Sequence, residues 1–491
     1  MKDNNKNQYK HYLQLLFVFL SAQLFYFYTL APTVLWGDQA IFQRLAYTLD
    51  FYTQNTYKKH LLWIILAHPV TKIPINNVAF RVNLFTSFWA AIAVFFVFAL
   101  LKNLTSSFWA SLSGAAALMV SHNFWFHAVH TEVYSFNMAL LAITLYYFTY
   151  PKAQNIHYLL GSITIGMAVT NHRMMWLAVP ALVILITGQF FEKKIGWSQI
   201  LFSFAGFIIT IIFLKIILSS YNICGTSTFT LKNYIPNWIE LPYELLKFAA
   251  YWVLQFPSPA LIIMIIGIRK SIKNFPLLLC LAFIWAANIF FLININFPDK
   301  YVFYMLSYFV GAIWIGLGVE PVLKWLTKIR WSSQAGAGVL LVLTILVCPI
   351  LTYTLAPRIL PLLGITSEKL GIREIPGRPA LKFFLLPSAR DYWGAHNYAE
   401  TVLNSLPPNA TIMADYTVAQ PMLYLQAIEK VRPDVNVAQI AMDEQKAFVS
   451  SYPKDRPLFL ALTKPYYDIN GISHYFTIVP CGLAYKLEPK E

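Results

Sequence analysis

Long apolar runs alternate with short polar connections over the first 355 residues. About 20 apolar residues cross the hydrocarbon core of a bilayer as a helix. The pattern predicts eleven such helices, over residues 12–33, 81–101, 106–121, 135–150, 157–170, 174–190, 198–219, 247–268, 275–293, 301–319 and 334–355. The fifth and sixth runs are short and share the polar turn Asn171-His172-Arg173, so they form either two spans or one re-entrant hairpin.

Two longer segments are more polar. Segment 34–80 contains apolar stretches at 39–50 and 61–70, which are too short to cross and suit helices lying in the membrane interface. In the tail, five prolines in 356–392 predict an irregular linker. After it the pattern predicts a helix, a strand, a helix and a strand, over 393–405, 411–414, 417–430 and 435–440.

The expected fold is therefore an α-helical polytopic membrane protein with a small C-terminal α/β domain outside the cytoplasm. Residues 1–355 form the transmembrane domain, with 34–80 as its first outer loop, and residues 356–491 form the linker and the small domain. The tail has no glycine-rich phosphate loop, so nucleotide binding is not expected there.

Lysine and arginine gather in the connections on one side of the predicted helices. They are Lys2, Lys6, Lys10, Lys102, Lys152, Lys193, Lys194, Arg269, Lys270, Lys273, Lys324, Lys328 and Arg330. The short connections on the other side hold little positive charge beyond Arg173 and Lys300. Because basic loops stay in the cytoplasm, we expect a cytoplasmic N-terminus and, after eleven spans, an outer C-terminus.

Composition agrees with a membrane protein. Hydrophobic residues make up 58% of the chain and charged residues 12%, whereas soluble domains average about 25% charged residues. This excludes an ordinary cytosolic enzyme, a disordered protein and a coiled coil. The net charge of +15 lies mostly in cytoplasmic loops that face anionic lipid. Since no basic-aromatic stripe accompanies it, membrane lipid is an expected partner and nucleic acid is not.

Asp38 is the first candidate for chemistry, because it follows the first predicted span at the outer surface. An ionisable residue at the top of a multi-span bundle favours a functional role, here as a general base that takes a proton from an acceptor. The alternative is that Asp38 caps the helix 39–50.

A second polar group lies in segment 121–137, between the third and fourth spans. His127, His130 and Tyr134 have the i, i+3, i+7 spacing of one helical face, and Glu132 lies among them. Two histidines and a carboxylate suit a divalent metal, whereas interfacial His and Tyr also line outer cavities or form membrane belts. Glu132 is the strongest candidate, because an anion there needs a cation, a metal or a substrate hydroxyl.

Two cations lie on the same outer side. Arg173 suits a phosphate, because a guanidinium binds phosphate bidentately, although snorkelling to lipid headgroups also explains it. Lys300 follows Asp299, and since neighbours on a helix do not face each other, the spacing favours a phosphate as the partner of Lys300. Carboxylates and cations at one membrane face are what an enzyme with a lipid-phosphate donor needs.

Several sequence blocks resemble one family. They are Gly37-Asp38, Phe80-Arg81-Val82-Asn83-Leu84, Phe124-Trp125, Glu132-Val133-Tyr134-Ser135, Asn171-His172 with Pro180, Asp299 with Tyr301 and Tyr304, Tyr424-Leu425-Gln426 and Arg432-Pro433-Asp434-Val435. The chain resembles, over most of its length, the multi-pass family long catalogued as a domain of unknown function. That family includes the transmembrane protein O-mannosyltransferase of plexin-type receptors.

The resemblance implies a GT-C glycosyltransferase fold and a sugar donor on a polyprenyl-phosphate carrier at the outer or lumenal face. Asp38 occupies the place of the family's essential carboxylate, so the implied reaction is a single displacement with inversion in which Asp38 deprotonates the acceptor. The acceptor is a protein Ser/Thr hydroxyl or an envelope glycan, and mannose or another hexose is the sugar. Glu132 is the second catalytic candidate.

The phosphate is assigned to Arg173 and Lys300 by inference from charge alone. The other candidates for substrate binding are polar and aromatic residues of the same face: His172, His60, Tyr134, Trp125 and His130. A divalent cation is compatible with such a site, but the sequence indicates no firm set of ligands.

The first outer loop departs from the family pattern. Members commonly carry Asp-x-Gly-Glu, whereas Asp38 is followed by Gln39-Ala40-Ile41, so the partner carboxylate is absent. A His-Pro-Pro-Gly-Tyr-Pro-like stretch is replaced by 56–63, in which Lys58, Lys59 and His60 are candidates to take over its work.

Two other functions compete with the enzyme. A transporter or flippase of a lipid-linked sugar or amphipathic anion needs inverted repeats and charges at mid-membrane, whereas the predicted spans are nearly free of charge. A non-catalytic assembly or lipid-binding protein would function without the Asp38 carboxylate. The expected location is a bacterial inner membrane, with the endoplasmic reticulum as the alternative.

Overall fold

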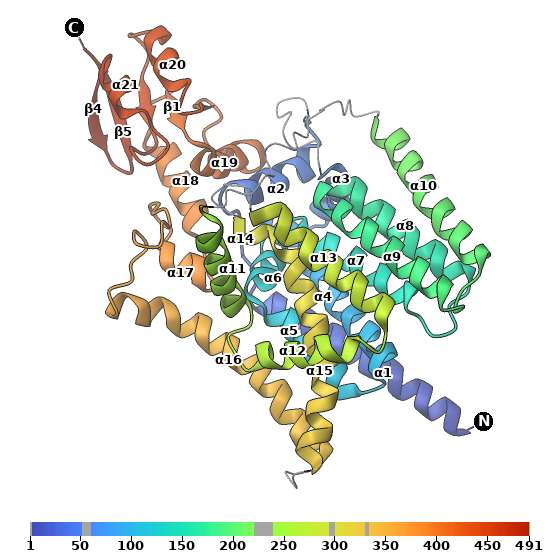
Figure 1. Ribbon diagram of the computed structural model, residues 1–491. Helices are drawn as coiled ribbons and strands as arrows, with labels where there is room; N and C mark the ends of the chain where they lie inside the picture. Colours follow the sequence, from blue (N-terminus) through green and yellow to red (C-terminus); the bar gives the residue numbers. More distant parts are fainter. Residues whose placement is uncertain (1, 52–59, 220–238, 294–299, 329–332, 491) are drawn as a thin grey trace.

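A helical bundle and a small sheet domain make up the protein (Figure 1). The computed structural model describes residues 2–51, 60–219, 239–293, 300–328 and 333–490. The longer helices of the bundle are α1 (Lys2–Tyr28), α4 (Val78–Thr105), α8 (Asn155–Asn171), α10 (Trp197–Ser219), α13 (Phe275–Ile293), α15 (Met305–Lys328) and α16 (Gln334–Leu362). Shorter helices complete it: α5 (Phe108–Val120), α6 (His122–Val129), α7 (Tyr134–Phe148), α9 (Ala178–Phe191), α11 (Leu241–Gln255), α12 (Ala260–Ser271) and α14 (Lys300–Phe303).

Within these described ranges, six helices are long and apolar enough to cross a membrane. They are Val78–Thr105, Arg173–Phe191, Trp197–Leu218, Phe275–Ile293, Met305–Lys328 and Gln334–Leu362. Shorter apolar helices lie among them, at Phe108–Val120 and Tyr134–Phe148 for example. The multi-pass helical fold is confirmed, whereas the number of eleven spans stays a prediction.

The continuous helix expected at 247–268 is wrong. The chain forms α11 and α12 instead, which meet at an angle of 103°. Pro257 and Pro259 lie in the break, and proline removes a backbone donor and disfavours helical geometry in the residue before it. The first helix also differs from its expected bounds, because it begins at Lys2 and ends at Tyr28, ahead of Pro32.

Short helices fill the segment between α1 and α4, as the apolar stretches predicted. They are α2 (Asp38–Thr48), α3 (Leu61–Ala67) and the 3₁₀ helix η2 (His68–Lys72). On α2 the apolar side chains of Ile41, Phe42 and Leu45 are buried, which fixes the helix on the bundle and orients its N-terminus. A further 3₁₀ helix, η3 (Arg173–Leu177), follows the polar turn after α8.

The C-terminal part is a five-stranded mixed sheet with helices, and its first strands and helices match the prediction. The elements are α17 (Ala380–Leu385), α18 (Gly394–Ser405), β1 (Thr411–Ala414), α19 (Tyr416–Tyr424), the π-helical turn η5 (Leu425–Glu429), β2 (Asn436–Gln439), α20 (Gln445–Ser451), β3 (Leu458–Leu460), α21 (Ile469–Ser473), β4 (Phe476–Cys481) and β5 (Ala484–Pro489). The strand order is β2-β1-β3-β5-β4. β1 is parallel to β2 and β3, and β5 is antiparallel to β3 and β4.

The irregular linker expected at 356–392 is wrong in part. α16 continues through Pro357 and Pro361 to Leu362, and α17 adds a further helical turn. Prolines are tolerated in membrane helices, because neighbouring groups satisfy the freed backbone carbonyls. The division of the chain at residue 355 stays a prediction.

Small residues allow two helices of the bundle to approach closely. A Cβ atom on Gly267 of α12 would lie 1.7 Å from the carbonyl oxygen of Trp314, and one on Gly318 of α15 would lie 1.9 Å from that of Ile263. Only glycine fits at these positions, as is common where membrane helices pack backbone to backbone.

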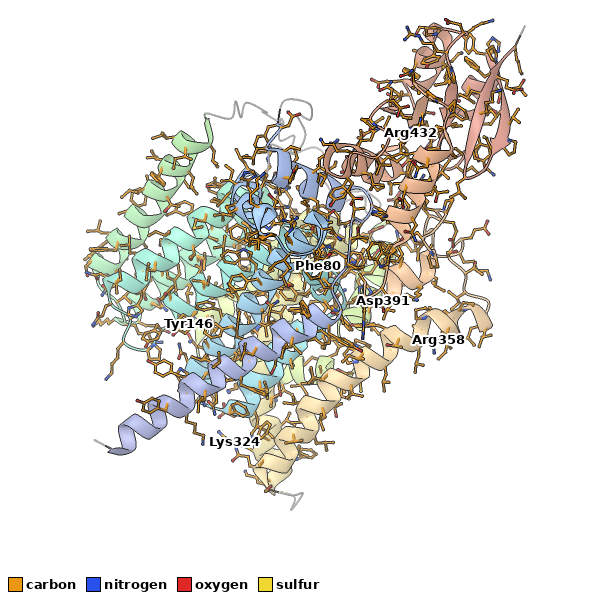
Figure 2. The ribbon with its side chains drawn as sticks, turned by 180° about the vertical axis from the view of Figure 1, so that it is seen from behind. Phe80, Tyr146, Lys324, Arg358, Asp391 and Arg432 are labelled. Atoms are coloured by element: carbon orange, nitrogen blue, oxygen red, sulfur yellow. The ribbon has the colours of Figure 1, made fainter. Side chains whose placement is uncertain are left out.

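The sheet domain lies against the end of the bundle that carries α2. α19 lies beside α2 in Figure 1, and Figure 2 shows Arg432 of the sheet domain and Lys324 of α15 at opposite ends of the molecule. Trp36 Nε1 donates to the Tyr392 hydroxyl at 2.7 Å, and the Ala79 amide donates to the Tyr424 hydroxyl at 3.0 Å. These bonds join the loop before α2 and the start of α4 to the C-terminal part.

Candidate functional site

Asp38 is the first residue of α2, and its side chain is exposed. Gly37 precedes it as the helix cap with φ of +57°, a left-handed conformation that glycine adopts without strain. The alternative that Asp38 caps this helix is therefore wrong. A carboxylate in the first turn is still stabilised by the helix dipole, so the fold presents an anion at the N-terminal end of α2.

Two neighbours of Asp38 connect it to other parts of the chain. The Tyr416 hydroxyl on α19 donates a hydrogen bond to Asp38 Oδ1. Gln39 Nε2 donates to Glu132 Oε1 at 3.2 Å, and Glu132 is only 5% exposed. The two carboxylates proposed from the sequence therefore lie on adjoining segments, one exposed and one buried. Gln39 therefore contacts the second carboxylate directly.

A buried amide network fixes this arrangement. Gln43 Nε2 donates to Asn83 Oδ1 and to Thr131 Oγ1, both at 3.0 Å, and Thr131 Oγ1 donates to Asn83 Oδ1 at 2.6 Å. Asn83 Nδ2 donates to the carbonyl of Ala31 at 2.9 Å. All three side chains are fully buried. The network joins α2, α4 and the segment before Glu132, and buried polar networks of this kind hold one geometry.

A cluster of rings lies beside the turn after α8. His60 Nδ1 lies 2.9 Å from the Asn171 carbonyl, and the His60 and His172 rings stack at 4.9 Å between centroids. The Tyr134 ring lies 5.6 Å from that of His172. Asn171 Oδ1 accepts from the Trp63 amide at 3.0 Å. Three of the candidates for substrate binding therefore come together next to α3 and α7.

The single helical face expected for His127, His130 and Tyr134 is wrong. α6 ends at Val129, His130 is extended, and α7 begins at Tyr134. His127 still packs on Tyr134 at 5.0 Å, but His130 turns away, against Phe126 at 4.1 Å. The physical reason is the break between α6 and α7, which sends side chains three residues apart in different directions.

His130 lines a cavity of about 270 Å³ together with Lys382, Phe383, Arg390 and Tyr392. Its ring is parallel to that of Phe383 at 6.1 Å. Burial lowers the pKa of His130 to about 3, so the ring is a neutral donor and acceptor at physiological pH. Among the described residues no cluster of three or more possible metal ligands is present, so His127, His130 and Glu132 are not grouped as the divalent site considered from the sequence requires.

Arg173 and Lys300, the two cations proposed from the sequence, differ in their surroundings. Arg173 begins η3 and is exposed beside the half-buried His172. Lys300 is buried, and its Nζ donates to Glu244 Oε2 at 2.6 Å and to the Ile293 carbonyl at 2.9 Å. Asp299, the neighbour considered as its partner, lies outside the described residues, as do Lys58 and Lys59. Glu244, from α11, holds the Lys300 ammonium in this structure.

Trp125 is 3% exposed, and its indole donates to the Thr29 hydroxyl at 3.0 Å. Its ring packs on Phe25 with 4.7 Å between centroids. These contacts hold α6 against α1 and its C-terminal end. They therefore support the position of the segment that carries Glu132. A role for Trp125 in binding substrate stays a prediction.

Sequence reasoning missed four polar residues around these candidates. They are Gln39, Gln43, Tyr416 and Glu244. Each acts through a partner far away in the sequence, so no local spacing indicates it. Asn83 is different, because it belongs to the sequence block Phe80-Arg81-Val82-Asn83-Leu84. Its buried hydrogen bonds give a structural role to the asparagine of that block.

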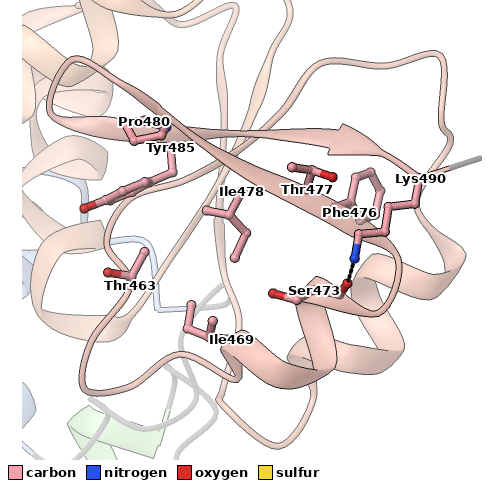
Figure 3. Close-up of a pocket in the computed structure, with 9 residues that line it drawn as sticks. All are labelled: Thr463, Ile469, Ser473, Phe476, Thr477, Ile478, Pro480, Tyr485 and Lys490. Atoms are coloured by element: carbon pink, nitrogen blue, oxygen red, sulfur yellow. Dashed lines mark hydrogen bonds between the residues drawn. The ribbon is translucent and has the colours of Figure 1, made fainter.

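A second cavity lies on the sheet domain, between α21 and strands β4 and β5 (Figure 3). It measures about 470 Å³, and Lys490 Nζ at its edge donates to the Ser473 carbonyl at 2.6 Å. Its other lining residues are Thr463, Ile469, Phe476, Thr477, Ile478, Pro480 and Tyr485. The carboxylates and cations proposed from the sequence do not line it.

Part of the chain is similar to known proteins. Residues 60–195 match the family described as the protein O-mannosyl-transferase TMEM260 N-terminal domain. The chain is 22% identical over 484 residues to the protein O-mannosyl-transferase tmem260 of Dictyostelium discoideum, covering 86% of this chain and 56% of that protein. The chain thus spans little more than half the length of this curated relative.

The fold is similar to that of ArnT from Cupriavidus metallidurans. The structure of ArnT bound to undecaprenyl phosphate superposes with a TM-score of 0.55 at 9% identity and covers 96% of this chain and 97% of ArnT. The apo structure gives a TM-score of 0.51 at 10% identity, with the same coverage. At such low identity the likeness establishes the fold alone.

The matched range includes Glu132 and the ring cluster, whereas Asp38 and Lys300 lie outside it. The resemblance suggested by the sequence blocks is thereby confirmed: residues 60–195 match the protein O-mannosyl-transferase TMEM260 N-terminal domain, and the chain has a GT-C-like fold.

Proposed function

We propose that this protein is a membrane glycosyltransferase that moves a sugar from a polyprenyl-phosphate carrier to an acceptor hydroxyl. Support comes from the curated relative, which is a protein O-mannosyl-transferase, and from ArnT, which has a similar fold and binds undecaprenyl phosphate. Mannose or another hexose is the sugar, and the acceptor is a protein Ser/Thr hydroxyl or an envelope glycan. The proposed transfer takes place on the outer face of the membrane.

The observation that carries this proposal is the exposed Asp38 carboxylate beside the buried Glu132. Asp38 accepts the proton of the acceptor hydroxyl while the acceptor oxygen forms a bond to the anomeric carbon. The bond from that carbon to the phosphate oxygen breaks on the opposite side, and polyprenyl phosphate leaves with the electron pair. The configuration at the anomeric carbon is therefore inverted.

Glu132 acts in a different way, because it is buried and engaged by Gln39. A buried anion is costly unless it is paired or hydrogen-bonded, and a bound sugar offers hydroxyl donors. We assign to Glu132 the orientation of the donor sugar, next to the ring cluster of His60, Tyr134 and His172.

The leaving phosphate needs cations. Arg173 is exposed at the start of η3 and suits a bidentate contact. Lys300 reaches a phosphate only by sharing or exchanging its bond to Glu244. Because Arg173 is exposed and Lys300 is buried, Arg173 is the more accessible of the two to a phosphate, and Lys300 contributes to the local field.

The proposed location is a multi-pass arrangement in a bacterial inner membrane, with the endoplasmic reticulum as the alternative. The N-terminus lies in the cytoplasm and the sheet domain lies outside, as the distribution of basic loops favours. This puts Asp38 and α19 on the side where lipid-linked sugar and acceptor meet.

Intact-mass analysis of envelope and secreted proteins tests the proposed function. Cells without the gene are compared with cells that express the wild-type chain or Asp38→Asn at equal membrane levels. The proposal expects a hexose-sized mass increment that is present only with the wild-type chain. An increment that is independent of the gene would overturn the assignment, and one restored by Asp38→Asn would overturn the role of Asp38.

A further inference from the structure

Helix α19 of the sheet domain brings a tyrosine to the proposed general base. Tyr416 is the first residue of α19, and its hydroxyl donates to Asp38 Oδ1 across 378 residues of sequence. Its ring also covers Gly37, where a Cβ atom would lie 3.4 Å from the ring. The sheet domain thus contributes a side chain to the proposed catalytic site itself.

The N-terminus of α19 is fixed by a buried ion pair. Asp415 caps the helix by accepting from the Thr417 amide at 2.9 Å. Its two carboxylate oxygens accept from Arg373 at 2.9 and 2.7 Å, and the Tyr467 hydroxyl donates to one of them at 2.8 Å. Asp415 is only 5% exposed. Since Tyr416 follows Asp415 directly, this pair sets where the phenol lies.

The bundle holds α19 from the other side. The Gly37 amide donates to the Thr417 carbonyl at 3.2 Å, and the Ala79 amide donates to the Tyr424 hydroxyl at 3.0 Å. Arg44 Nη2 lies 3.5 Å from Gln420 Oε1. These bonds span the length of α19, so the helix is held along the surface formed by α2 and the start of α4.

We propose that Tyr416 is a positioning residue for Asp38, and that docking of the sheet domain completes the catalytic site. This inference rests on the proposed function. Asp38 is exposed at a helix end, where its carboxylate has several accessible rotamers. A hydrogen bond from the phenol selects one of them, and catalytic groups act efficiently when second residues hold them in place. The site therefore depends on two parts of the chain that are distant in sequence.

The kinetic test compares two tyrosines of the same helix. Tyr416→Phe removes only the hydroxyl that bonds Asp38, whereas Tyr424→Phe removes only the hydroxyl that accepts from the Ala79 amide. We expect Tyr416→Phe to lower kcat about tenfold, the effect of one lost hydrogen bond, with the acceptor KM unchanged. Tyr424→Phe removes one of several bonds that hold α19, and the bonds of Gly37 to Thr417 and of Arg44 to Gln420 remain, so we expect the domain to stay docked and kcat to stay at the wild-type value. Equal kcat in the two variants would overturn positioning and leave Tyr416 with a docking role only.

A stability measurement separates this inference from the proposed function. Thermal unfolding in detergent is compared for Tyr416→Phe, Asp38→Ala and the double variant. Coupled residues give non-additive changes in the unfolding free energy, which we expect here whether or not transfer is measured. Additive changes would overturn the contact. If the unfolding data show that Tyr416 and Asp38 are coupled but the wild-type chain transfers no sugar from a polyprenyl-phosphate donor, the proposed function is overturned. Tyr416 then remains the partner of Asp38.

Discussion

At the scale of single residues, the site depends on a few buried polar side chains more than on the candidates themselves. Asn83 is the clearest case, because it accepts from Gln43 and Thr131 and donates to Ala31. Each of these groups is buried, so removing one partner leaves others without a hydrogen bond. Such unsatisfied groups cost more than the bond itself contributes.

We expect Asn83→Ala to lower the free energy of unfolding by about 1–3 kcal/mol and to reduce sugar transfer, since α2 and the Glu132 segment lose their common partner. Thr86→Val is the matched control on the same helix. Thr86 donates only to the Val82 carbonyl within α4, so we expect a change below about 1 kcal/mol. Thermal unfolding in detergent measures both. Equal losses in the two variants would contradict the role of the network.

A second residue-scale prediction concerns pH. His396 Nε2 lies 3.0 Å from Glu429 Oε2, and the hydrogen bond that His396 donates to Glu429, opposed by burial, raises the pKa of His396 above its usual 6.5. Because the pKa of His396 is higher in the folded than in the unfolded state, protonated His396 stabilises the sheet domain fully below pH 6.5. This contribution to the free energy of unfolding is lost as the pH rises through the raised pKa. We expect the unfolding temperature to fall from about pH 6 to about pH 9 by more in the wild type than in His396→Gln. Identical slopes would contradict this coupling.

The sequence predicted the site unevenly at this scale. Asp38, Glu132 and the rings of His60 and His172 were accessible from position and from resemblance. Lys300 was a candidate from the sequence, but its partner Glu244 was not, because Glu244 lies 56 residues away on a different helix. No spacing rule connects residues that only the packed bundle brings together.

At the scale of elements, hydrophobic pattern and turn residues located the first strands and helices of the sheet domain, α18, β1, α19 and β2, whereas β3, β4 and β5 had no counterpart in the prediction. The bend between α11 and α12 was missed, although Pro257 and Pro259 are visible in the sequence. The opposite error occurred in α16, where Pro357 and Pro361 suggested a linker but the helix continues. A proline ends a helix only where its neighbours leave the freed carbonyls unsatisfied, and this is a tertiary property.

The close approach of α12 and α15 gives an element-scale prediction. Gly267→Ala places a methyl group against the Trp314 carbonyl, so the helices must separate. We expect a loss of at least about 1–3 kcal/mol in the unfolding free energy, as for other overpacked contacts, seen as a lower unfolding temperature. Gly196→Ala is the control, since its nearest neighbour lies 3.6 Å away. A wild-type unfolding temperature for Gly267→Ala would contradict the packing.

The pair of Lys300 and Glu244 joins α14 to α11. Both side chains are mostly buried, at 10% and 15% exposure. We expect Lys300→Met to destabilise the protein by about 1–3 kcal/mol, because it leaves a partly buried carboxylate without its main partner. Lys300→Met combined with Glu244→Gln should recover part of this loss. A double variant no more stable than Lys300→Met would contradict the pairing.

At the scale of the whole molecule, the bundle presents α2 at one end, and the sheet domain covers that end through α19 (Figure 1). The general class was predictable, because apolar runs and their spacing indicate a multi-pass bundle, and short apolar runs between turn residues indicate the small α/β domain. The docking was not, since Tyr416, Tyr424 and Tyr392 meet the bundle through hydrogen bonds that leave no periodic signal.

The central claim is that Asp38 is the base of a sugar transfer from a polyprenyl-phosphate donor. Its most direct test is the rate of transfer by purified protein in detergent, comparing wild type with Asp38→Asn and with Asp443→Asn, a carboxylate exposed on the sheet domain. We predict that Asp38→Asn lowers kcat by about 10²–10⁴ while thermal stability changes little, because the amide oxygen still accepts from the Tyr416 hydroxyl, and that Asp443→Asn transfers at the wild-type rate. Wild-type transfer by Asp38→Asn would contradict the account.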